Sequence, residues 1–355
     1  MNKLYSILMA CCVFCSVISC TDKTQRISYS TATLDMLASK NVIFEKVSEG
    51  VQFVTPMQII GLNDSLLVVF DIDADKKCKL LNTSGMLLGE FAQLGHSNDE
   101  LISPVGISVD DKSMVNVYDY SSRMLISYSI PDVIKGKTNS LRRINIRQLL
   151  ENNKIEKTGI NYVQSIDSDH HILFGNNRNR IMLLDGEKIN NIYKVYPGTD
   201  SDEECNWAIW GYSVQYGLSP DHKHLVLTTY VGALFEIFNI EDGNVVSSTL
   251  KGFFPPSYDI AIGAIPKWIS PDADSPEGFC ALCTTNDRFY ASIGGIDCVH
   301  RNEIYSFDYN GNAIGKYVLP GDLTCFTLLN DYFYFIIENK NGEYELYKAG
   351  RSEFL

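Results

Sequence analysis

The chain has 355 residues, of which 45% are hydrophobic and 11% aromatic, and its formal net charge is −13. Its lysines and arginines are scattered, so it lacks the concentrated basic face that binds phosphate backbones, and we expect no nucleic-acid partner. The length alone would allow two domains, but 20 tyrosines and 17 phenylalanines suit one large β-sheet core.

The first 19 residues are predicted to be an export signal. Lys3 precedes an apolar run over residues 4–18, which is too short to span a bilayer as a stable helix and has the position of a secretory hydrophobic region. The run ends in Val17-Ile18-Ser19-Cys20, which resembles the lipobox of bacterial lipoproteins. That resemblance implies that residues 1–19 are a lipoprotein signal peptide and that Cys20 is acylated as the new N-terminus.

Residues 20–41 are predicted to form the lipidated cysteine and a tether. The residues after Cys20 are polar and mixed in charge. Thr21 follows the cysteine where an aspartate would act as a retention signal, which by analogy with enterobacterial sorting favours the outer membrane. We therefore expect a cell-envelope protein that is lipid-anchored at the outer membrane, and both a periplasmic and a surface-facing orientation remain open.

From about residue 58 onward, the sequence repeats packets of short apolar runs separated by polar turns. Phe70-Asp71 and Tyr118-Asp119 occupy the same position in two successive packets. The equivalent positions in all six packets are Phe70, Tyr118, Phe174, Thr228, Ala291 and Ile336, which are 48, 56, 54, 63 and 45 residues apart. The shorter steps are typical of propeller blades of about 40–50 residues. The pattern predicts an all-β, six-bladed β-propeller with four-stranded antiparallel blades.

The last packet stops after its third strand, at Tyr347. The ring can close only if a segment from the other end supplies the fourth strand, and residues 42–47 (VIFEKV) have the required pattern. The propeller is therefore predicted to span residues 42–355, with an N-terminal strand that completes the last blade beside residues 344–347. A pair of β-sandwiches would explain the strands but not their six-fold recurrence.

Several of these features together resemble a known family, the TolB-like six-bladed propeller lipoproteins of Bacteroidetes, which are similar to NHL-type propellers. The resemblance rests on Cys20, on the two Asp-ended strands, on the hairpin at residues 82–85 and on residues 95–104 (GHSNDELISP). That last stretch is a partial match to the Gly-x-Gly-x-x-Glu-Phe-x-x-Pro crossing between blades, with Ser97 in place of the second glycine. The resemblance implies fold and compartment, and it brings no settled activity.

The candidate ligand-binding residues lie on long connections between blades, at residues 131–160, 197–211 and 252–277. These connections share the face of a propeller around the mouth of its channel. Large rings on such loops suit stacking on sugar faces or anchoring a protein partner. The alternative is that the rings fold back over apolar strand edges. The candidate rim residues are Trp207, Trp210, Trp268, Phe253 and Tyr258.

Metal and catalytic motifs are weak, and we expect no metal, no cofactor and no catalytic residue. Residues 71–75 (DIDAD) alternate carboxylates like a calcium loop, but Lys76 stands where the turn glycine belongs, so we interpret them as a turn between strands. Cys280 and Cys283 have redox-like spacing within a strand pattern and are interpreted as buried packing residues.

The histidines are predicted to divide between two faces. Four are expected to be solvated in turns on the face opposite the mouth, namely His170, His171, His222 and His224. His96 and His300 are expected on the mouth side, where they could join carboxylates at a metal.

Two functional hypotheses follow. The first is a non-catalytic, lipid-anchored binding or scaffold protein that presents an aromatic-rich rim to a glycan, a peptide or an envelope protein. The second is a propeller enzyme of the lactonase-like or lyase-like type, with a divalent metal in the central channel. Several convergent carboxylates or a bound metal along the channel would favour the enzyme, and a mostly apolar or solvent-filled channel with exposed rim tryptophans would favour the binding protein.

Overall fold

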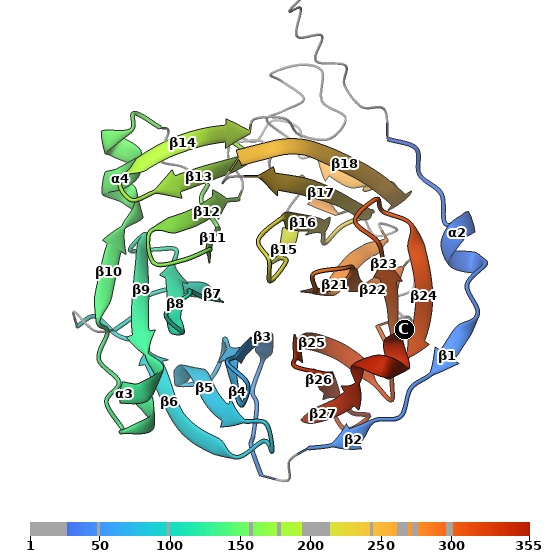
Figure 1. The fold of residues 1–355 in the computed structure, drawn as a ribbon, viewed down its shortest axis with the longest axis horizontal. Coiled ribbons are helices and arrows are strands. Elements are labelled where there is room, and N and C mark those ends of the chain that lie inside the picture. The colour runs from blue at the N-terminus through green and yellow to red at the C-terminus, as the bar shows by residue number, and fades with distance from the viewer. Residues whose placement is uncertain are drawn as a thin grey trace, which may run out of the picture.

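The computed structural model describes residues 27–47, 50–97, 100–155, 159–175, 179–193, 214–241, 244–260, 269–271, 276–295 and 301–355. Within these ranges, six antiparallel sheets stand as blades around a central axis (Figure 1). The innermost strand of each blade faces the axis, and the chain then runs outward through the blade. The predicted six-bladed β-propeller is confirmed.

Each blade is built from strands that follow one another in the sequence. Blades 1 and 2 consist of β3 (Pro56–Leu62), β4 (Leu66–Asp71), β5 (Lys76–Asn82) and β6 (Leu87–Gln93), followed by β7 (Pro104–Val109), β8 (Met114–Asp119), β9 (Met124–Ser129) and β10 (Arg142–Asn145). Blades 3 and 4 consist of β11 (Tyr162–Ser165), β12 (His170–Phe174), β13 (Ile181–Asp185) and β14 (Lys188–Tyr193), followed by β15 (Val214–Leu218), β16 (His224–Thr229), β17 (Ala233–Glu241) and β18 (Asn244–Phe254). Blades 5 and 6 contain β21 (Glu277–Thr284), β22 (Phe289–Gly295), β23 (Glu303–Phe307) and β24 (Ala313–Val318), followed by β25 (Asp322–Leu329), β26 (Tyr332–Glu338) and β27 (Tyr344–Gly350).

The hydrophobic core lies between neighbouring blades. The second strand of a blade is covered on both sides, so in β4 every residue after Leu66 is buried, and β8 repeats this pattern. A strand buried on both faces is expected to have a continuous apolar run, whereas a half-exposed strand alternates. One cluster joins blade 1 to blade 2 through Phe70 and Tyr128, and another joins blade 6 to blade 1 through Ile336 and Val69. The packing between blades therefore makes the ring one cooperative unit.

The N-terminal segment closes the ring as predicted. Strand β2 (Glu45–Lys46) pairs antiparallel with β27, with Lys46 opposite Tyr347. The amide of Val47 extends this pairing by donating to the carbonyl of Leu346 at 2.8 Å. Blade 6 thus has four strands, of which the outermost comes from the other end of the chain.

The same segment also crosses the outer edges of two other blades (Figure 1). Strand β1 (Ser39–Asn41) pairs in parallel with β24 as a fifth strand of blade 5. Further upstream, Tyr29 bridges to Gly252 in blade 4, and α2 (Ala32–Asp35) buries Leu34 against the core between blades 4 and 5. The tether predicted over residues 20–41 is therefore corrected, since residues 27–41 belong to a strap that packs on the propeller.

The connection at residues 131–160 is more than a loop. It contains α3 (Ile130–Ile134), the fourth strand of blade 2, and α4 (Ile146–Asn152). Asn145 caps α4 by accepting a hydrogen bond from the amide of Gln148 at 3.0 Å. In the described part of the chain, no helix has the length and hydropathy of a membrane-spanning helix.

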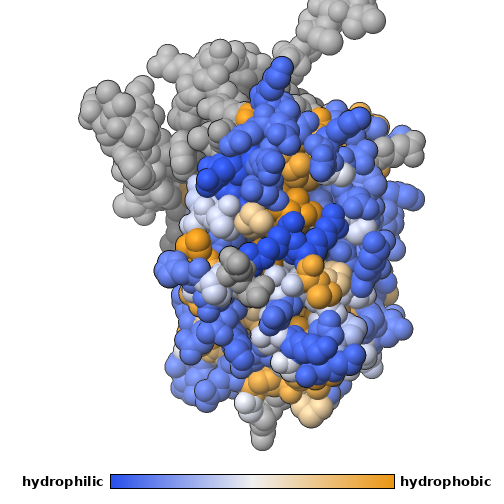
Figure 2. All heavy atoms as spheres, turned by 90° about the vertical axis from the view of Figure 1, so that its left-hand side faces the viewer, coloured by the Kyte–Doolittle hydropathy of each residue, from blue (hydrophilic) through white to orange (hydrophobic). Residues whose placement is uncertain are grey.

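The outer wall of blades 2 and 3 is largely hydrophilic (Figure 2). Hydrophobic residues appear on this side only in small separate groups. Scattered apolar residues are normal on a soluble surface and do not mark a binding site. A functional site is therefore expected in the channel or at one of its two ends.

Candidate functional site: the central channel and its mouth

A cavity of about 420 Å³ occupies the centre of the ring. It is lined by residues of all six innermost strands, β3, β7, β11, β15, β21 and β25. Small-molecule sites in proteins usually have volumes of roughly 300–1,000 Å³ and often lie in such central positions. The channel is therefore the main candidate site among the described residues.

The described lining of the cavity contains no aspartate, glutamate, lysine or arginine. Its polar groups are amides, hydroxyls, thiols and one imidazole, and the remaining side chains are apolar. The polar lining residues include Gln58, Tyr162, Gln164, Ser165, Gln215, Tyr216, Ser219, His222, Tyr230 and Thr284. A ligand in this channel would meet hydrogen-bonding groups without meeting a fixed charge.

Five of these side chains, Gln58, Tyr162, Gln215, Tyr216 and Tyr230, form a connected set that we call the tyrosine–glutamine ring. The side chain of Tyr230 interacts with those of both Tyr162 and Gln215. The side chain of Tyr216 interacts with that of Gln58. The rings of Tyr162 and Tyr216 lie in tilted contact, with centroids 5.2 Å apart. The set therefore links blades 1, 3 and 4 across the channel.

The tyrosine–glutamine ring lies toward one end of the channel, which we call the mouth. The mouth is the end at which innermost strands begin and second strands finish. Tyr162 is the first residue of β11, and Tyr230 directly follows the second strand of its blade, β16. The opposite end of the cavity is lined by Ser219 and His222, which lie in the turn between β15 and β16.

Burial sets the protonation state of the three tyrosines. Because burial penalises the phenolate, it raises the pKa of Tyr162 and Tyr216 above the usual value and raises that of Tyr230 still more strongly. All three hydroxyls therefore stay neutral over the physiological pH range, and each can both donate and accept a hydrogen bond.

Several exposed apolar side chains lie on blades 1 and 2 close to the strand ends at the mouth. Five apolar side chains there are between 40% and 53% exposed, namely Val54, Met57, Leu94, Ile102 and Tyr120. We call this set the mouth patch. Met57 belongs both to the patch and to the lining of the cavity, so the two surfaces are continuous.

Two buried aspartates hold the backbone of the mouth patch. The carboxylate of Asp71 accepts hydrogen bonds from the amides of Val54 at 3.0 Å and Thr55 at 2.7 Å. One blade further on, Asp119 accepts from the amides of Ile102 and Ser103. The repeated aspartate is thus a structural anchor for the segments that enter the innermost strands of blades 1 and 2, and residues 72–75 join β4 to β5.

The five predicted rim residues are only partly covered by the described structure. Trp207, Trp210 and Trp268 lie outside the described residues, and for Tyr258 only the backbone is described, in β19 (Tyr258–Ile260), where it pairs with Pro271 of β20 (Ile269–Pro271). Phe253 is corrected: it is 3% exposed and packs against Phe235, Phe279 and Phe307 in the core between blades 4 and 5. A ring in this position cannot stack on a ligand.

The two cysteines of the redox-like motif both lie on β21 and line the channel. Cys283 is buried, whereas Cys280 is only half-buried and follows Phe279 at a β-bulge. Burial raises the pKa of the Cys283 thiol to about 12, so this thiol is unreactive at neutral pH. The interpretation as buried packing residues therefore holds for Cys283 but not for Cys280.

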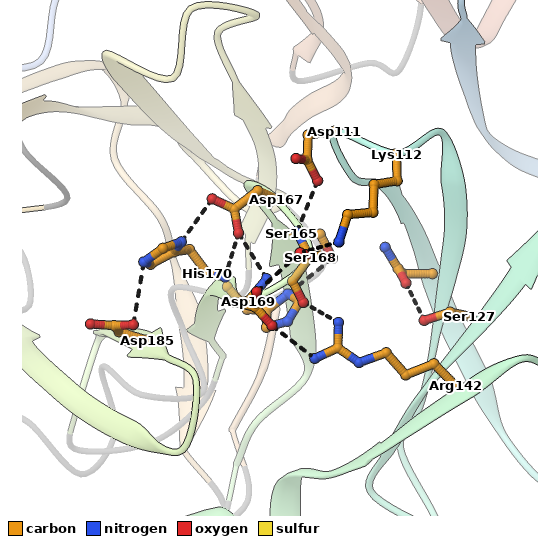
Figure 3. A network of polar contacts seen from close by, with 12 residues as sticks. Asp111, Lys112, Ser127, Arg142, Ser165, Asp167, Ser168, Asp169, His170 and Asp185 are labelled. Carbon is orange, nitrogen blue, oxygen red and sulfur yellow. Dashed lines mark hydrogen bonds and ion pairs between the residues drawn. The ribbon is translucent and has the colours of Figure 1, made fainter.

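The four histidines opposite the mouth differ in exposure and in their contacts. His170 is exposed and lies between Asp167, at 2.7 Å, and Asp185, at 3.3 Å (Figure 3). His171 is corrected, because its side chain is 2% exposed and its Nδ1 lies 3.1 Å from Ser165 Oγ. His222 is exposed and His224, which is half-buried, stacks on Tyr309.

The residues expected on the mouth side do not meet at a metal site in the described structure. His96 is exposed, and His300 lies outside the described residues. Within the described ranges, no group of three or more histidine, cysteine, aspartate or glutamate side chains could hold a metal ion. The described channel also offers no carboxylate, the ligand that hard divalent cations require. Its donor set therefore does not fit the catalytic metal of the enzyme hypothesis.

The fold and the channel define a six-bladed propeller with an uncharged central cavity. The chain belongs to the TolB-like family of six-bladed propellers, because the family described as TolB-like 6-blade propeller-like matches residues 35–331. No curated protein matches the chain.

Solved structures support the fold. A member of the duf4221 family from Bacteroides vulgatus has a TM-score of 0.55 at 10% identity, over 88% of this chain and 97% of that chain. A putative exported protein from Bacteroides fragilis has a TM-score of 0.54 at 13% identity, over 91% of this chain and 98% of that chain. At these identities the similarity shows the shared fold alone.

Proposed function

We propose that this chain is a non-catalytic, lipid-anchored binding protein of the cell envelope that engages its ligand or partner at the mouth of the propeller. The observation that carries the proposal is the continuity between an uncharged cavity and the exposed mouth patch. Both surfaces suit binding, and the described channel has no carboxylate pair and no group of three or more histidine, cysteine, aspartate or glutamate side chains that could hold a metal ion for hydrolysis. The described channel therefore does not support the lactonase-like or lyase-like alternative.

The mouth patch supports the proposal because its apolar side chains stand on a fixed backbone. Val54 and Ile102 are both more than half exposed, yet the buried carboxylates of Asp71 and Asp119 hold their amides. A preorganised apolar surface loses little conformational entropy on binding, which favours its use as an interface. Patches of exposed apolar residues beside a cavity commonly mark binding sites.

The envelope location is proposed from the sequence. The lipobox-like residues before Cys20 support lipid attachment, and the strap over residues 27–47 then leads directly onto blades 4, 5 and 6. A glycan, a peptide or an envelope protein would each be accessible to a propeller held at a membrane in this way.

Site-specific photo-crosslinking in intact cells tests the binding face. A photoreactive phenylalanine analogue replaces Ile102 in the mouth patch or, as the control, Val246 on the outermost strand of blade 4. Both side chains are 51% exposed, so the two positions differ in place but not in accessibility. We expect a discrete crosslinked species from position 102 and none from position 246. Equal crosslinking at both positions, or none at either, would contradict the mouth as the binding face.

A further inference from the structure

We propose that the tyrosine–glutamine ring is a binding site for a small neutral molecule rich in hydroxyl groups, such as a single sugar unit at the end of a glycan. This inference rests on the proposed binding function and names the ligand class of its central cavity.

The ring brings hydroxyl and amide groups from three blades to one place. Tyr162, Tyr216 and Tyr230 supply phenol groups, and Gln58 and Gln215 supply amides. A glutamine side chain offers two donor hydrogens and a carbonyl acceptor, and a phenol offers one donor and an acceptor. Such groups match the paired donor and acceptor character of sugar hydroxyls.

The absence of charged side chains from the described lining disfavours ionic ligands. No described lining residue carries a carboxylate, an ammonium or a guanidinium group. A charged ligand would have to leave water for a site without a counter-charge, which is strongly unfavourable. A neutral hydroxylated ligand can instead exchange its hydrogen bonds to water for hydrogen bonds to the ring. The lining therefore favours a neutral sugar over an acidic or basic molecule of the same size.

Neighbouring groups hold Tyr162, Tyr216 and Gln58 in place. Phe174 is fully buried and contacts both rings, with centroids 4.4 Å from Tyr216 and 5.7 Å from Tyr162. On the amide side, Gln58 Oε1 accepts a hydrogen bond from the amide of Ile107 at 2.8 Å. A site whose side chains are already fixed loses less entropy when the ligand binds.

Gly106 of blade 2 keeps space free where the ring converges. A Cβ atom at this position would lie 3.2 Å from Gln58 Oε1, 3.5 Å from the Tyr216 hydroxyl and 3.8 Å from Tyr162 Cδ1. Three side chains from three strands therefore meet around a position without a side chain. Glycine frequently occupies places where a backbone approaches a ligand closely.

The site is also accessible at its mouth and large enough for a sugar. The cavity of about 420 Å³ falls within the usual range for small-molecule sites. Met57, which is 45% exposed, lines the cavity and belongs to the mouth patch. One sugar unit could therefore occupy the cavity while the rest of a glycan lies across the mouth.

Isothermal titration calorimetry with the purified chain tests the inference. The probes are glucose, galactose and N-acetylglucosamine, together with two charged counterparts of similar size, glucuronate and glucosamine. We expect at least one neutral sugar to bind at millimolar concentrations or below, and we expect its charged counterparts to bind at least tenfold more weakly.

Two variants locate the binding site. Tyr216→Phe removes one hydroxyl but keeps the aromatic ring, and the loss of one neutral hydrogen bond is expected to weaken binding about tenfold. Gly106→Ala should weaken binding by narrowing the space between the side chains. Tyr332→Phe is the control, because Tyr332 is exposed on β26, outside the cavity lining. Thermal unfolding of each variant confirms that it is folded.

The outcomes separate this inference from the proposed function. Charged sugars that bind as well as neutral ones, or binding that is unchanged in a folded Tyr216→Phe variant, would overturn the inference. The absence of binding by every neutral sugar would overturn it as well. In each case, crosslinking at Ile102 would still report on the mouth as a binding face, so the two proposals can fail independently.

Discussion

The rings of Phe44 and Phe335 meet edge to face, with centroids 5.3 Å apart, so the N-terminal strap packs directly on the second strand of the last blade. Phe44 immediately precedes β2 and belongs to the apolar cluster between blades 5 and 6. Closure of the ring therefore depends on side-chain packing as well as on the short backbone pairing of β2 with β27.

Phe44→Ala is expected to lower the free energy of unfolding by about 2 kcal/mol, below the range for fully buried phenylalanines because Phe44 is only half-buried. Ile43→Ala is the control, since the Ile43 side chain is 78% exposed and its loss should change stability by less than about 0.5 kcal/mol. Urea denaturation followed by circular dichroism measures both. Equal effects of the two substitutions would show that Phe44 does not close the ring.

The ion pair between Asp71 and Lys79 is predicted to stabilise blade 1 strongly. The Lys79 Nζ atom lies 2.6 Å from Asp71 Oδ2, and both side chains are at least 93% buried. Asp71→Asn leaves a buried ammonium group without its counter-charge, and we expect a loss of about 3–5 kcal/mol in the free energy of unfolding.

A second substitution and a surface control complete this test. The double variant Asp71→Asn with Lys79→Met removes both charges and should recover part of the loss. Glu345→Gln breaks the pair with Lys46, whose side chain is 42% exposed, and should cost no more than about 1 kcal/mol. If the double variant is no more stable than the Asp71→Asn variant, the expected recovery fails and the buried pair is not coupled.

The sequence predicted the fold well because the propeller repeats a local pattern. Phe70-Asp71 and Tyr118-Asp119 occupy the same place in successive packets, and the structure gives the reason, since each aspartate binds two amides of the segment entering its blade. Likewise, the missing fourth strand of the last packet pointed to residues 42–47, because a closed ring leaves no unpaired edge.

The sequence predictions were wrong where a difference of one position along a strand decides the face to which a side chain points. Phe253 was placed on a loop, but β18 continues through it, so its ring points into the core. His170 and His171 were both assigned to a solvated turn, but they begin β12, where neighbouring side chains point to opposite faces. One is exposed and the next is buried.

The tyrosine–glutamine ring could not be recognised as a sequence motif. Gln58, Tyr162 and Tyr216 are far apart in the sequence and meet only because their blades share one axis. A weak signal was present: Gln58, Gln164 and Gln215 each place an amide on an innermost strand. An alignment of the innermost strands with one another would have found this repetition.

Lipid attachment at Cys20 is a prediction from the sequence alone. Cys20→Ala should abolish incorporation of a radiolabelled fatty acid and move the protein from the membrane fraction to the soluble fraction. Cys15→Ala is the matched control, because Cys15 lies within the predicted signal peptide and is not expected to be acylated. Persistent labelling of the Cys20→Ala variant would contradict the anchor.

The adjacent histidines His170 and His171 are predicted to give opposite pH dependences of stability. Burial, together with the positive charge of Arg142, lowers the pKa of His171 to about 4, although Asp167 and Asp169 oppose the shift. The hydrogen bond to Asp167 raises the pKa of His170. Between pH 4 and 6.5 the unfolded state therefore binds more protons at His171 than the folded state does, so stability falls as the pH falls through this window.

Substitution of each histidine should isolate its contribution. A pKa shift of this size at His171 corresponds to a change of about 3 kcal/mol in the free energy of unfolding between pH 6.5 and 4. His171→Asn should remove that part of the pH dependence. His170 gains stability from its charged form, which is fully present below pH 6.5 and lost as the pH rises through its folded pKa. His170→Asn should therefore lower stability by a constant amount below pH 6.5 and change its pH dependence only at and above pH 6.5. Urea denaturation of the three proteins between pH 4 and 8 measures both effects. A His171→Asn profile parallel to that of the unsubstituted protein would show that the buried imidazole is not the titrating group.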